Sequence, residues 1–363
     1  MAKNKFYSLT NILATGAQYN VIYGERSNGK TYSVLQYGIQ QYAENKKQIA
    51  IVRRWAEDFV GKRGTVMFDS LVDNKEISKA TKGEWTGVYY YGSKWYLCRY
   101  DEEGKRVTDE TPFAYGFSIS AMEHDKSTSY PNITTIMFDE FITRTVYLPD
   151  EFVLFMNVVS TIVRNRTDVK IFMLGNTVNK YCPYFAEMGL KHAKDMKQGT
   201  IDVYRYGDSN LTVAVEYTAN REAKESDMYF AFDNPKLTMI TGGAWEIDIY
   251  PHCPVKYTPK EILFTYFIVF DNEMLQCEIV QHEELLFTFI HRKTTPLKDT
   301  DNDLIYTTEF SPRPNYRRKI TKPTSDFEKK IAWFYQTDKV FYSDNEVGEI
   351  VRNYLQWCGK IVS

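Results

Sequence analysis

The chain has 363 residues, of which 43% are hydrophobic and 25% are charged, and its formal net charge is −2. This composition is typical of a globular protein of about two domains. No apolar run reaches the roughly 18 residues of a membrane span, and neither membrane insertion nor secretion is expected. The five cysteines lie far apart without a CxxC pair, so neither zinc nor disulfides are indicated. Because the chain is not basic overall, a nucleic-acid surface requires local basic patches or several subunits around a channel.

A phosphate-binding loop is predicted close to the N-terminus. The segment GERSNGKT follows a short apolar strand at 19–23 and precedes a helical pattern that starts at Tyr32. In such loops the backbone cradles phosphates, the lysine reaches the β- and γ-phosphates and the hydroxyl binds Mg²⁺. The alternative is a glycine turn that matches by chance, which the strand and helix on either side make a poor explanation. The pattern predicts an ATP site formed by Gly24, Glu25, Arg26, Ser27, Asn28, Gly29, Lys30 and Thr31, with Thr31 as a ligand of Mg²⁺.

A second buried strand at 133–138 (ITTIMF) ends in a pair of carboxylates, Asp139 and Glu140. This is the pattern of a Walker B strand. Asp139 is expected to hold Mg²⁺, and Glu140 to orient and deprotonate the attacking water. Such a pair often does no more than open a turn, but its position after a phosphate loop favours the catalytic interpretation.

Two further strands are expected to bring polar side chains to the same edge of a parallel sheet. The strand at 48–52 ends in Arg53 and Arg54, which either approach the nucleotide or a neighbouring subunit or form a solvated basic pair. The strand at 169–174 leads to Asn176, which either senses the γ-phosphate or the attacking water or only forms a turn.

The expected fold class is α/β, with a P-loop ATPase domain of mostly parallel sheet and a β-meander inserted at 85–120. The composition changes near residue 203, which predicts a domain junction. We therefore expect a P-loop domain at 1–202, a linking element at 203–230 and a smaller α+β domain at 231–363. The last domain is expected to contain antiparallel strands at 262–270, 275–280 and 285–291 and helices at 327–336 and 345–357.

Together with GERSNGKT, the segments SYPNITTIMFDEFI, IVRR, IVRNR and MLGN resemble the genome-packaging ATPases of phi-29-like podoviruses. The resemblance covers most of residues 6–190 in order and spacing. It is weak over the C-terminal third of the chain.

The resemblance implies a terminase-like ATPase of the additional-strand (ASCE, RecA-like) class that translocates double-stranded DNA into a procapsid. It implies a pentameric ring at the portal vertex in the host cytoplasm, with a packaging RNA as a further partner. Arg164 corresponds to an arginine finger offered to the neighbouring subunit, and Lys126 to a second contact of that kind, with a solvated loop lysine as its alternative. The C-terminal domain is expected to be RNase H-like and inactive as a nuclease.

Three other functions compete with this reading. A terminase that also cuts DNA would use carboxylates such as Asp271 and Glu273, but no full set of metal ligands is evident. A nonenzymatic assembly protein is disfavoured by the intact phosphate loop and carboxylate pair. A metabolic P-loop kinase would transfer phosphate to a small acceptor and would be indifferent to DNA.

Overall fold

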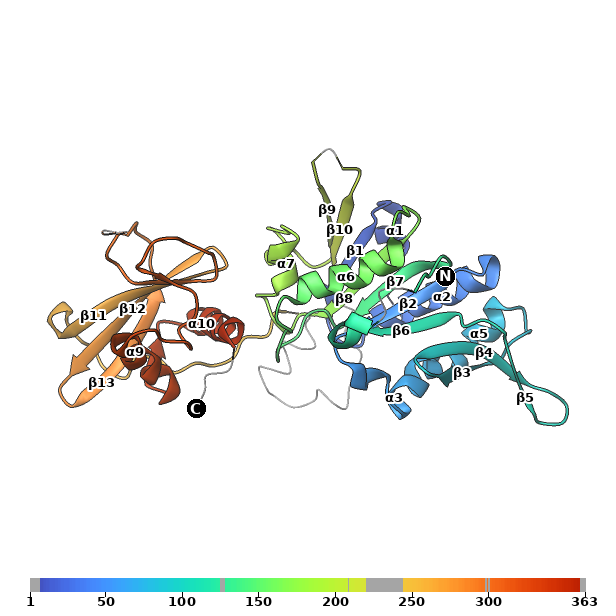
Figure 1. Cartoon of the computed structure of the whole chain (residues 1–363), viewed down its shortest axis with the longest axis horizontal. Helices are drawn as coiled ribbons and strands as arrows, with labels where there is room; N and C mark the ends of the chain where they lie inside the picture. Colours follow the sequence, from blue (N-terminus) through green and yellow to red (C-terminus); the bar gives the residue numbers. More distant parts are fainter. Residues whose placement is uncertain are drawn as a thin grey trace. The chain divides into compact units, whose positions relative to one another are not determined.

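The computed structural model of the chain describes residues 7–124, 128–207, 209–219, 244–297, 299 and 301–359. The chain divides into two compact units, Met1–Glu246 and Ile247–Ser363 (Figure 1). No helix in these described ranges is long and apolar enough to span a bilayer.

The first unit is built on one large mixed sheet. Its described part contains ten strands in the order β3-β4-β6-β2-β7-β8-β1-β10-β9, with β5 paired to β4. The six neighbours from β6 to β10 run parallel to one another. The strands at its centre are buried along almost their whole length, as strands covered on both faces are. The strands are β1 (Tyr19–Gly24), β2 (Gln48–Arg53), β3 (Gly87–Tyr91), β4 (Lys94–Tyr100), β5 (Arg106–Thr108), β6 (Ala114–Ser118), β7 (Ile133–Asp139), β8 (Lys170–Asn176), β9 (Thr200–Arg205) and β10 (Thr212–Tyr217).

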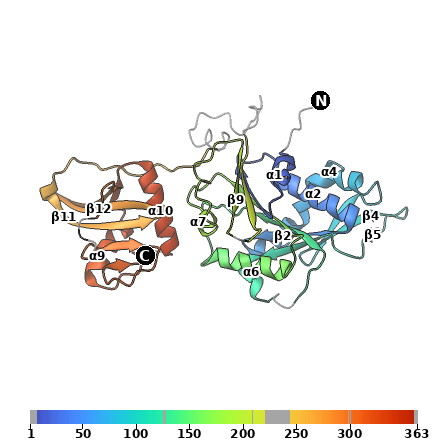
Figure 2. The ribbon, with the colours of Figure 1, turned by 90° about the horizontal axis from the view of Figure 1, so that it is seen from above.

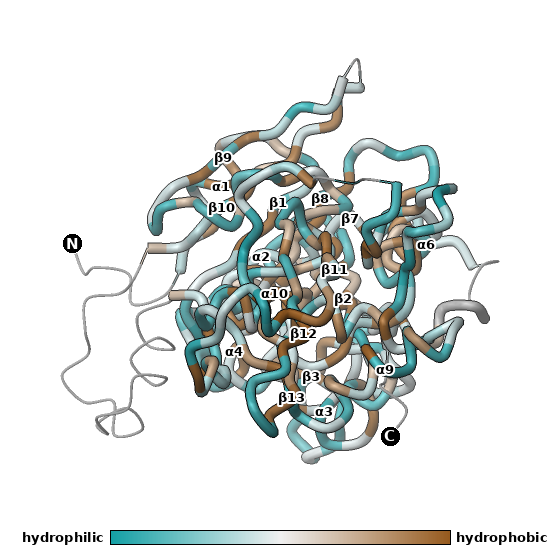
Figure 3. Tube along the Cα trace, turned by 90° about the vertical axis from the view of Figure 1, so that its left-hand side faces the viewer, coloured by the Kyte–Doolittle hydropathy of each residue, from teal (hydrophilic) through white to brown (hydrophobic). Residues whose placement is uncertain are grey.

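Helices cover both faces of this sheet (Figures 1 and 2). One core lies between the sheet and helices α6 and α7, and the other lies between the opposite face and helices α1, α2, α4 and α5. Figure 3 shows brown, hydrophobic stretches along the strands and teal, hydrophilic stretches along many outer loops. The helices are α1 (Thr10–Ala14), α2 (Lys30–Asn45), α3 (Lys62–Thr65), α4 (Asp69–Asp73), α5 (Glu76–Ala80), α6 (Glu151–Val163) and α7 (Pro183–Glu187), and the short 3₁₀ helices are η1 (Ala56–Phe59), η2 (Val66–Phe68) and η3 (Ile119–His124).

Strands β9 and β10 correct the predicted domain boundary. β10 pairs in parallel with β1, the strand that leads into the phosphate loop, and β9 pairs antiparallel with β10 at the edge. The prediction of a separate linking element from residue 203 onward is therefore wrong for these two strands. Strand β10 was not assigned to the first domain because the charged segment that follows it suggested a domain junction. The strand itself is buried along almost its whole length. Residues 220–243 of the expected linker lie outside the described residues.

The meander expected at 85–120 forms, but it extends the main sheet. β3 and β4 make an antiparallel hairpin, and β4 pairs antiparallel with β6. β6 in turn lies parallel to β2 and so belongs to the central sheet. The predicted insertion is thus an antiparallel extension of the sheet at its far edge.

The second unit contains a smaller mixed sheet. Its described strands follow the order β15-β14-β11-β12-β13-β16. Strands β11 to β13 form an antiparallel meander, while β14 lies parallel to β11 and β15 parallel to β14. Three antiparallel strands with two parallel ones added beside the first are the arrangement expected for an RNase H-like domain. The strands are β11 (Ile262–Phe270), β12 (Glu273–His282), β13 (Leu285–Arg292), β14 (Ile305–Thr307), β15 (Tyr316–Arg317) and β16 (Val340–Tyr342).

Two helices complete this unit close to their predicted positions, α9 (Asp326–Gln336) and α10 (Asn345–Cys358), and a 3₁₀ turn, η4 (Pro259–Glu261), precedes β11. Both helices begin at side-chain caps. Ser325 accepts a hydrogen bond from the Glu328 backbone, and Asp344 accepts one from the Val347 backbone.

Candidate active site

The phosphate loop connects β1 to the N-terminus of α2. Gly29 adopts a left-handed conformation with φ of 91° directly before the first helical residue, so the free N–H groups of α2 face the loop. Gly24 lies against the end of β10, where an added Cβ would come within 2.0 Å of Thr218 Oγ1. Thr218 in turn accepts a hydrogen bond from Asn28 at 3.0 Å. The loop is therefore shaped partly by β10, a strand that the sequence reading placed outside this domain.

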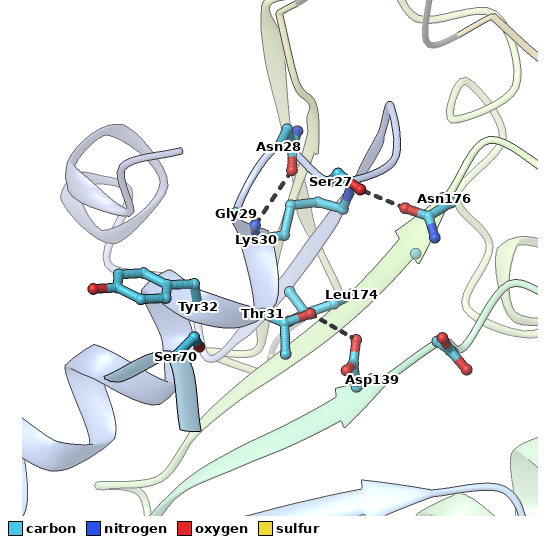
Figure 4. A pocket seen from close by; sticks show the side chains of 12 residues that line it. Ser27, Asn28, Gly29, Lys30, Thr31, Tyr32, Ser70, Asp139, Leu174 and Asn176 are labelled. Atoms are coloured by element: carbon cyan, nitrogen blue, oxygen red, sulfur yellow. Dashed lines mark hydrogen bonds between the residues drawn. The ribbon is translucent and has the colours of Figure 1, made fainter. Parts of the chain in front are cut away.

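The side chains of Lys30 and Asn176 contact each other beside the phosphate loop (Figure 4). Lys30 Nζ donates to the backbone carbonyl of Glu25 at 2.7 Å and to Asn176 Oδ1 at 3.2 Å. β8 delivers Asn176 beside Gly24 because β1 and β8 pair in parallel register up to these two residues. These contacts hold the ammonium group of Lys30 next to the phosphate loop, where it can contact a bound anion.

Thr31 and Asp139 supply a pair of converging oxygen atoms. Thr31 Oγ1 donates to Asp139 Oδ1 at 3.1 Å (Figure 4). Hydroxyl and carboxylate oxygens are the ligands that suit a hard cation, and Mg²⁺ takes only one or two such protein ligands. The two residues border a cavity of about 520 Å³ that is lined by Ser27, Asn28, Gly29, Lys30, Thr31, Tyr32, Ser70, Asp139, Glu140, Leu174, Gly175 and Asn176.

Glu140 follows Asp139 with its backbone in the left-handed region, at φ of 61°. A glutamate rarely takes this conformation, and such strain concentrates at functional sites. Glu140 lines the cavity and its side chain is 65% exposed, while that of Asp139 is 8% exposed. The two carboxylates thus have different environments.

Arg53 bridges both carboxylates. Its guanidinium lies 2.8 Å from Asp139 Oδ2 and 3.0 Å from Glu140 Oε2. β2 places it there because Val52 pairs with Phe138, next to the carboxylates. Of the two possibilities left open by the sequence, Arg53 approaches the site.

Arg54 faces the other way and has a structural role. It makes two buried contacts to the carboxylate of Glu151, at 2.8 and 2.9 Å, and donates to the backbone carbonyls of Glu140 and Phe141. Glu151 also accepts from Tyr184 at 2.9 Å. Arg54 therefore fixes the turn that carries Glu140 to the first turn of α6, and it is not a solvated residue.

Arg164 lies away from this cavity. It follows α6, and its guanidinium donates to the Thr128 carbonyl at 3.0 Å. The neighbouring Arg166 donates to carbonyls before and at the start of β7, including that of Ile133 at 2.6 Å. The strand β7 separates this edge from Glu140 by about 20 Å, from a rise of about 3.3 Å per residue. Arg164 therefore cannot serve the site of its own chain in this conformation, and Lys126 lies outside the described residues.

Arg164 also has an unusual backbone, with φ of 50° and ψ of −119°. This conformation is normally reserved for glycine. Arg164 and Glu140 thus both have a positive φ, which is uncommon for residues other than glycine.

The chain returns to the phosphate loop at residues 245 and 246, a contact that the sequence did not suggest. The Trp245 ring stacks on Tyr23 with centroids 5.3 Å apart, and its indole donates to the Lys194 carbonyl. Glu246 forms an ion pair with Arg26 of the phosphate loop at 3.4 Å. Arg26 thus has a protein partner in addition to its place in the loop.

In the second unit, the carboxylates considered for a nuclease are not gathered. Asp271 lies in the turn before β12, and Glu273 lies 3.5 Å from Arg292. In the described part of the chain, no three His, Cys, Asp or Glu residues are close enough to hold a metal ion.

The fold of the first unit is that of a P-loop ATPase domain. Around one cavity at the edge of its sheet it brings together Lys30, Thr31, Asp139, Glu140 and Asn176. Residues 101–240 match the family described as Podovirus DNA encapsidation protein (Gp16). The DNA packaging protein of Bacillus phage phi29 is 28% identical over 188 residues, covering 51% of this chain and 50% of that protein. That of Bacillus phage B103 is 27% identical over 174 residues, covering 47% and 48%. The chain thus spans about half the length of the curated relatives it matches.

Two solved structures share the fold over nearly the whole chain. The Phi-28 gp11 DNA packaging motor has a TM-score of 0.56 at 18% identity and covers 99% of both chains. The bacteriophage Phi-29 viral genome packaging motor assembly has a TM-score of 0.55 at 17% identity, covering 96% of this chain and 97% of the other. The resemblance to the packaging proteins of phi29-like phages, indicated by the motifs, is confirmed.

Proposed function

We propose that this chain is the ATP-driven motor that translocates viral double-stranded DNA into the procapsid during genome packaging. The observation that carries the proposal is the convergence of Lys30, Thr31, Asp139 and Glu140 around one cavity, in a chain with the fold of packaging-motor proteins. In this proposal, the residues at the sheet edge would bind the phosphates and the metal and would activate the attacking water.

ATP would lie with its phosphates against the loop Gly24–Thr31, with Lys30 at the β- and γ-phosphates. Thr31 and Asp139 would hold Mg²⁺. When bound, this ion would neutralise negative charge on the transferred phosphoryl group. The 3.1 Å separation of Thr31 Oγ1 and Asp139 Oδ1 fits such a site.

Glu140 would accept the proton of the attacking water, because its carboxylate is the exposed one of the pair and points into the cavity. Asn176 already accepts a hydrogen bond from Lys30. When ATP binds, its γ-phosphate would replace Asn176 as the hydrogen-bond partner of Lys30, and Asn176 would thereby respond to the bound nucleotide. Loss of that phosphate after hydrolysis would restore the contact.

Arg164 would act on the site of the neighbouring subunit in a ring, which we propose to be a pentamer. Arg164 is too far from Glu140 of its own chain to act there, so a role at the site of a neighbouring subunit is consistent with its position. A guanidinium supplied in trans stabilises transition-state charge and can contribute about 10³–10⁵ in rate. Lys126 is proposed as a second trans contact on the family resemblance alone.

The proposed partners are double-stranded DNA, a packaging RNA and the portal of the procapsid, which the protein would join transiently from the host cytoplasm. DNA contact would be mainly to phosphates and hence independent of sequence and sensitive to salt. We propose that the second unit serves in binding and does not cut DNA. Metal-dependent nicking that disappears in Asp271→Ala would instead establish the terminase alternative.

The test is steady-state ATP hydrolysis with and without double-stranded DNA across a range of protein concentrations. The variants are Glu140→Gln, Arg164→Ala and a mixture of the two, with Arg63→Ala as a control for loss of an exposed arginine. We expect both single variants to be inactive and the control to resemble wild type. The mixture should recover part of the turnover, because a subunit with an intact Glu140 can receive Arg164 from its neighbour.

Turnover that is independent of concentration and unchanged by DNA would remove the motor assignment and favour a simple ATPase or kinase. An active Arg164→Ala protein that still responds to DNA would leave the motor in place but remove the arginine finger.

A further inference from the structure

One face of the antiparallel extension of the first sheet packs against the core shared with α2 and α5. On the other face Tyr115 of β6 packs against the core that contains residues of α6 and α7. Val88, Tyr90, Trp95, Leu97 and Val107 belong to or pack against the core shared with α2 and α5. Successive residues of a strand point to opposite faces, so their neighbours in sequence share the other face.

That other face carries aromatic and basic side chains. We call it the tyrosine face. The strand register sets Tyr89 opposite Tyr96, Tyr91 opposite Lys94, Tyr100 opposite Arg106 and Lys94 opposite Tyr115. Within the described strands β3 to β6, no carboxylate lies on this face. Its members are Tyr89, Tyr91, Lys94, Tyr96, Tyr100, Arg106 and Tyr115.

Two of the five rings on this face are exposed, and those of Tyr89, Tyr96 and Tyr115 are half-buried. Tyr91 is 69% and Tyr100 is 67% exposed, which is unusual for large aromatic side chains in regular strands. The Arg106 guanidinium stacks over the Tyr89 ring at 3.6 Å from its centroid. The face thus already contains one planar cation stacked on an aromatic ring, the type of surface on which a nucleobase stacks.

The spacing of the rings distinguishes between nucleic-acid structures. Residues two apart on one strand, such as Tyr89 and Tyr91, are separated by about 6.6 Å. Stacked bases in a duplex are only about 3.4 Å apart. The rings therefore match bases that have been separated from one another, as in a single strand.

A cavity lies next to this face. It has a volume of about 620 Å³ and is bordered by Lys94, Tyr115, Ser118 and Tyr130, among others. Lys94 lies over the Tyr115 ring at 5.9 Å, and Tyr115 meets Tyr130 edge to face at 5.5 Å. The cavity continues the aromatic and basic character of the face and offers a hollow for a base beyond the exposed rings.

We propose that the tyrosine face binds unpaired nucleotides of single-stranded nucleic acid. The rings would stack on bases, while Lys94 and Arg106 would contact phosphates. This site is separate from the nucleotide cavity and does not depend on the proposed motor function. The chemistry is shared by single-stranded RNA and DNA, and contacts to the 2′-hydroxyl would distinguish them.

The test is fluorescence anisotropy of labelled oligonucleotides of about a dozen nucleotides, using oligo-U, oligo-dT and a duplex DNA of the same length with the full-length protein. We expect Tyr91→Ala and Tyr100→Ala each to weaken single-strand binding at least about fivefold. Tyr91→Phe should retain binding because the ring remains. Phe310→Ala is the matched control, since Phe310 is an aromatic residue of the second unit that is 83% exposed.

Arg106→Gln should reduce the slope of log affinity against log salt by about 0.7, the value for one phosphate contact in a single strand. ATP hydrolysis without nucleic acid should be unchanged in all these variants. Preference for oligo-U or oligo-dT assigns the partner as RNA or DNA. Single-strand affinity unaffected by Tyr91→Ala and Tyr100→Ala, or equal losses for the duplex, would overturn the proposal.

Discussion

The guanidinium of Arg53 contacts Asp139, the carboxylate proposed to hold Mg²⁺, as well as the neighbouring Glu140. A cation at Thr31 and Asp139 must either displace this guanidinium or lie beside its positive charge, and both oppose binding. A hydrogen bond to a charged group contributes about 1.5–3 kcal/mol, and the contact of Arg53 to Asp139 is largely buried at 2.8 Å. The contact to the exposed Glu140 contributes at most about 1 kcal/mol. Since about 1.4 kcal/mol corresponds to a factor of ten, Arg53→Gln should strengthen Mg²⁺ binding about tenfold or more.

The assay is a Mg²⁺ titration at a saturating concentration of a fluorescent, non-hydrolysable ATP analogue. We expect the Mg²⁺ concentration at half-saturation to fall in Arg53→Gln and Arg53→Leu. Arg63→Gln is the matched control, because this exposed arginine has only a 3.7 Å contact with Asp58 outside the cavity. A half-saturation point that stays constant or rises in the Arg53 variants would refute the competition.

Three further predictions concern the phosphate loop, the buried ion pair of Glu151 and a histidine of the second unit. Gly24→Ala should weaken binding of the ATP analogue at least about tenfold, because its Cβ would meet Thr218 Oγ1 at 2.0 Å, and Thr218→Ala should partly restore it; no recovery would contradict this cause. Glu151→Ala should lower the urea-measured free energy of unfolding by about 3–5 kcal/mol, since it leaves a buried guanidinium unpaired, and a loss below about 1 kcal/mol would argue against this. The hydrogen bond to Glu278 raises the pKa of His291, so its contribution is complete below about pH 6 and is lost as the pH rises through that raised pKa. His291→Gln should therefore destabilise the protein in acid and have no effect in alkaline buffer, and a penalty that persists there would contradict the assignment.

The convergence of the residues at the candidate nucleotide site was predictable from sequence, because its geometry is local or follows from parallel strands. The loop and the start of α2 are contiguous, and Asp139 and Asn176 end strands whose carboxyl edges must coincide in a parallel sheet. The three antiparallel strands and two helices of the second unit were also predictable, since each has its own periodicity and turn residues.

Other features depend on pairing between distant segments. Nothing in the sequence around Thr218 indicates that its strand will lie beside β1, because parallel neighbours need not be adjacent in the chain. The arginine pair after β2 was recognised, but which one reaches the carboxylates depends on the direction of each side chain. The alternation of β3 and β4 was visible, yet whether one face stays uncovered is decided by the arrangement of helices.

Thr218 and Trp245 attach to the same part of the fold. Thr218 contacts Asn28 and Trp245 stacks on Tyr23, while Glu246 pairs with Arg26. All three contacts are made to the phosphate loop and its strand. Binding energies that share such contacts are thermodynamically linked, and the linkage is reciprocal. A partner that displaced Trp245 and Glu246 would change the affinity for ATP by the same factor by which ATP changes the affinity for that partner.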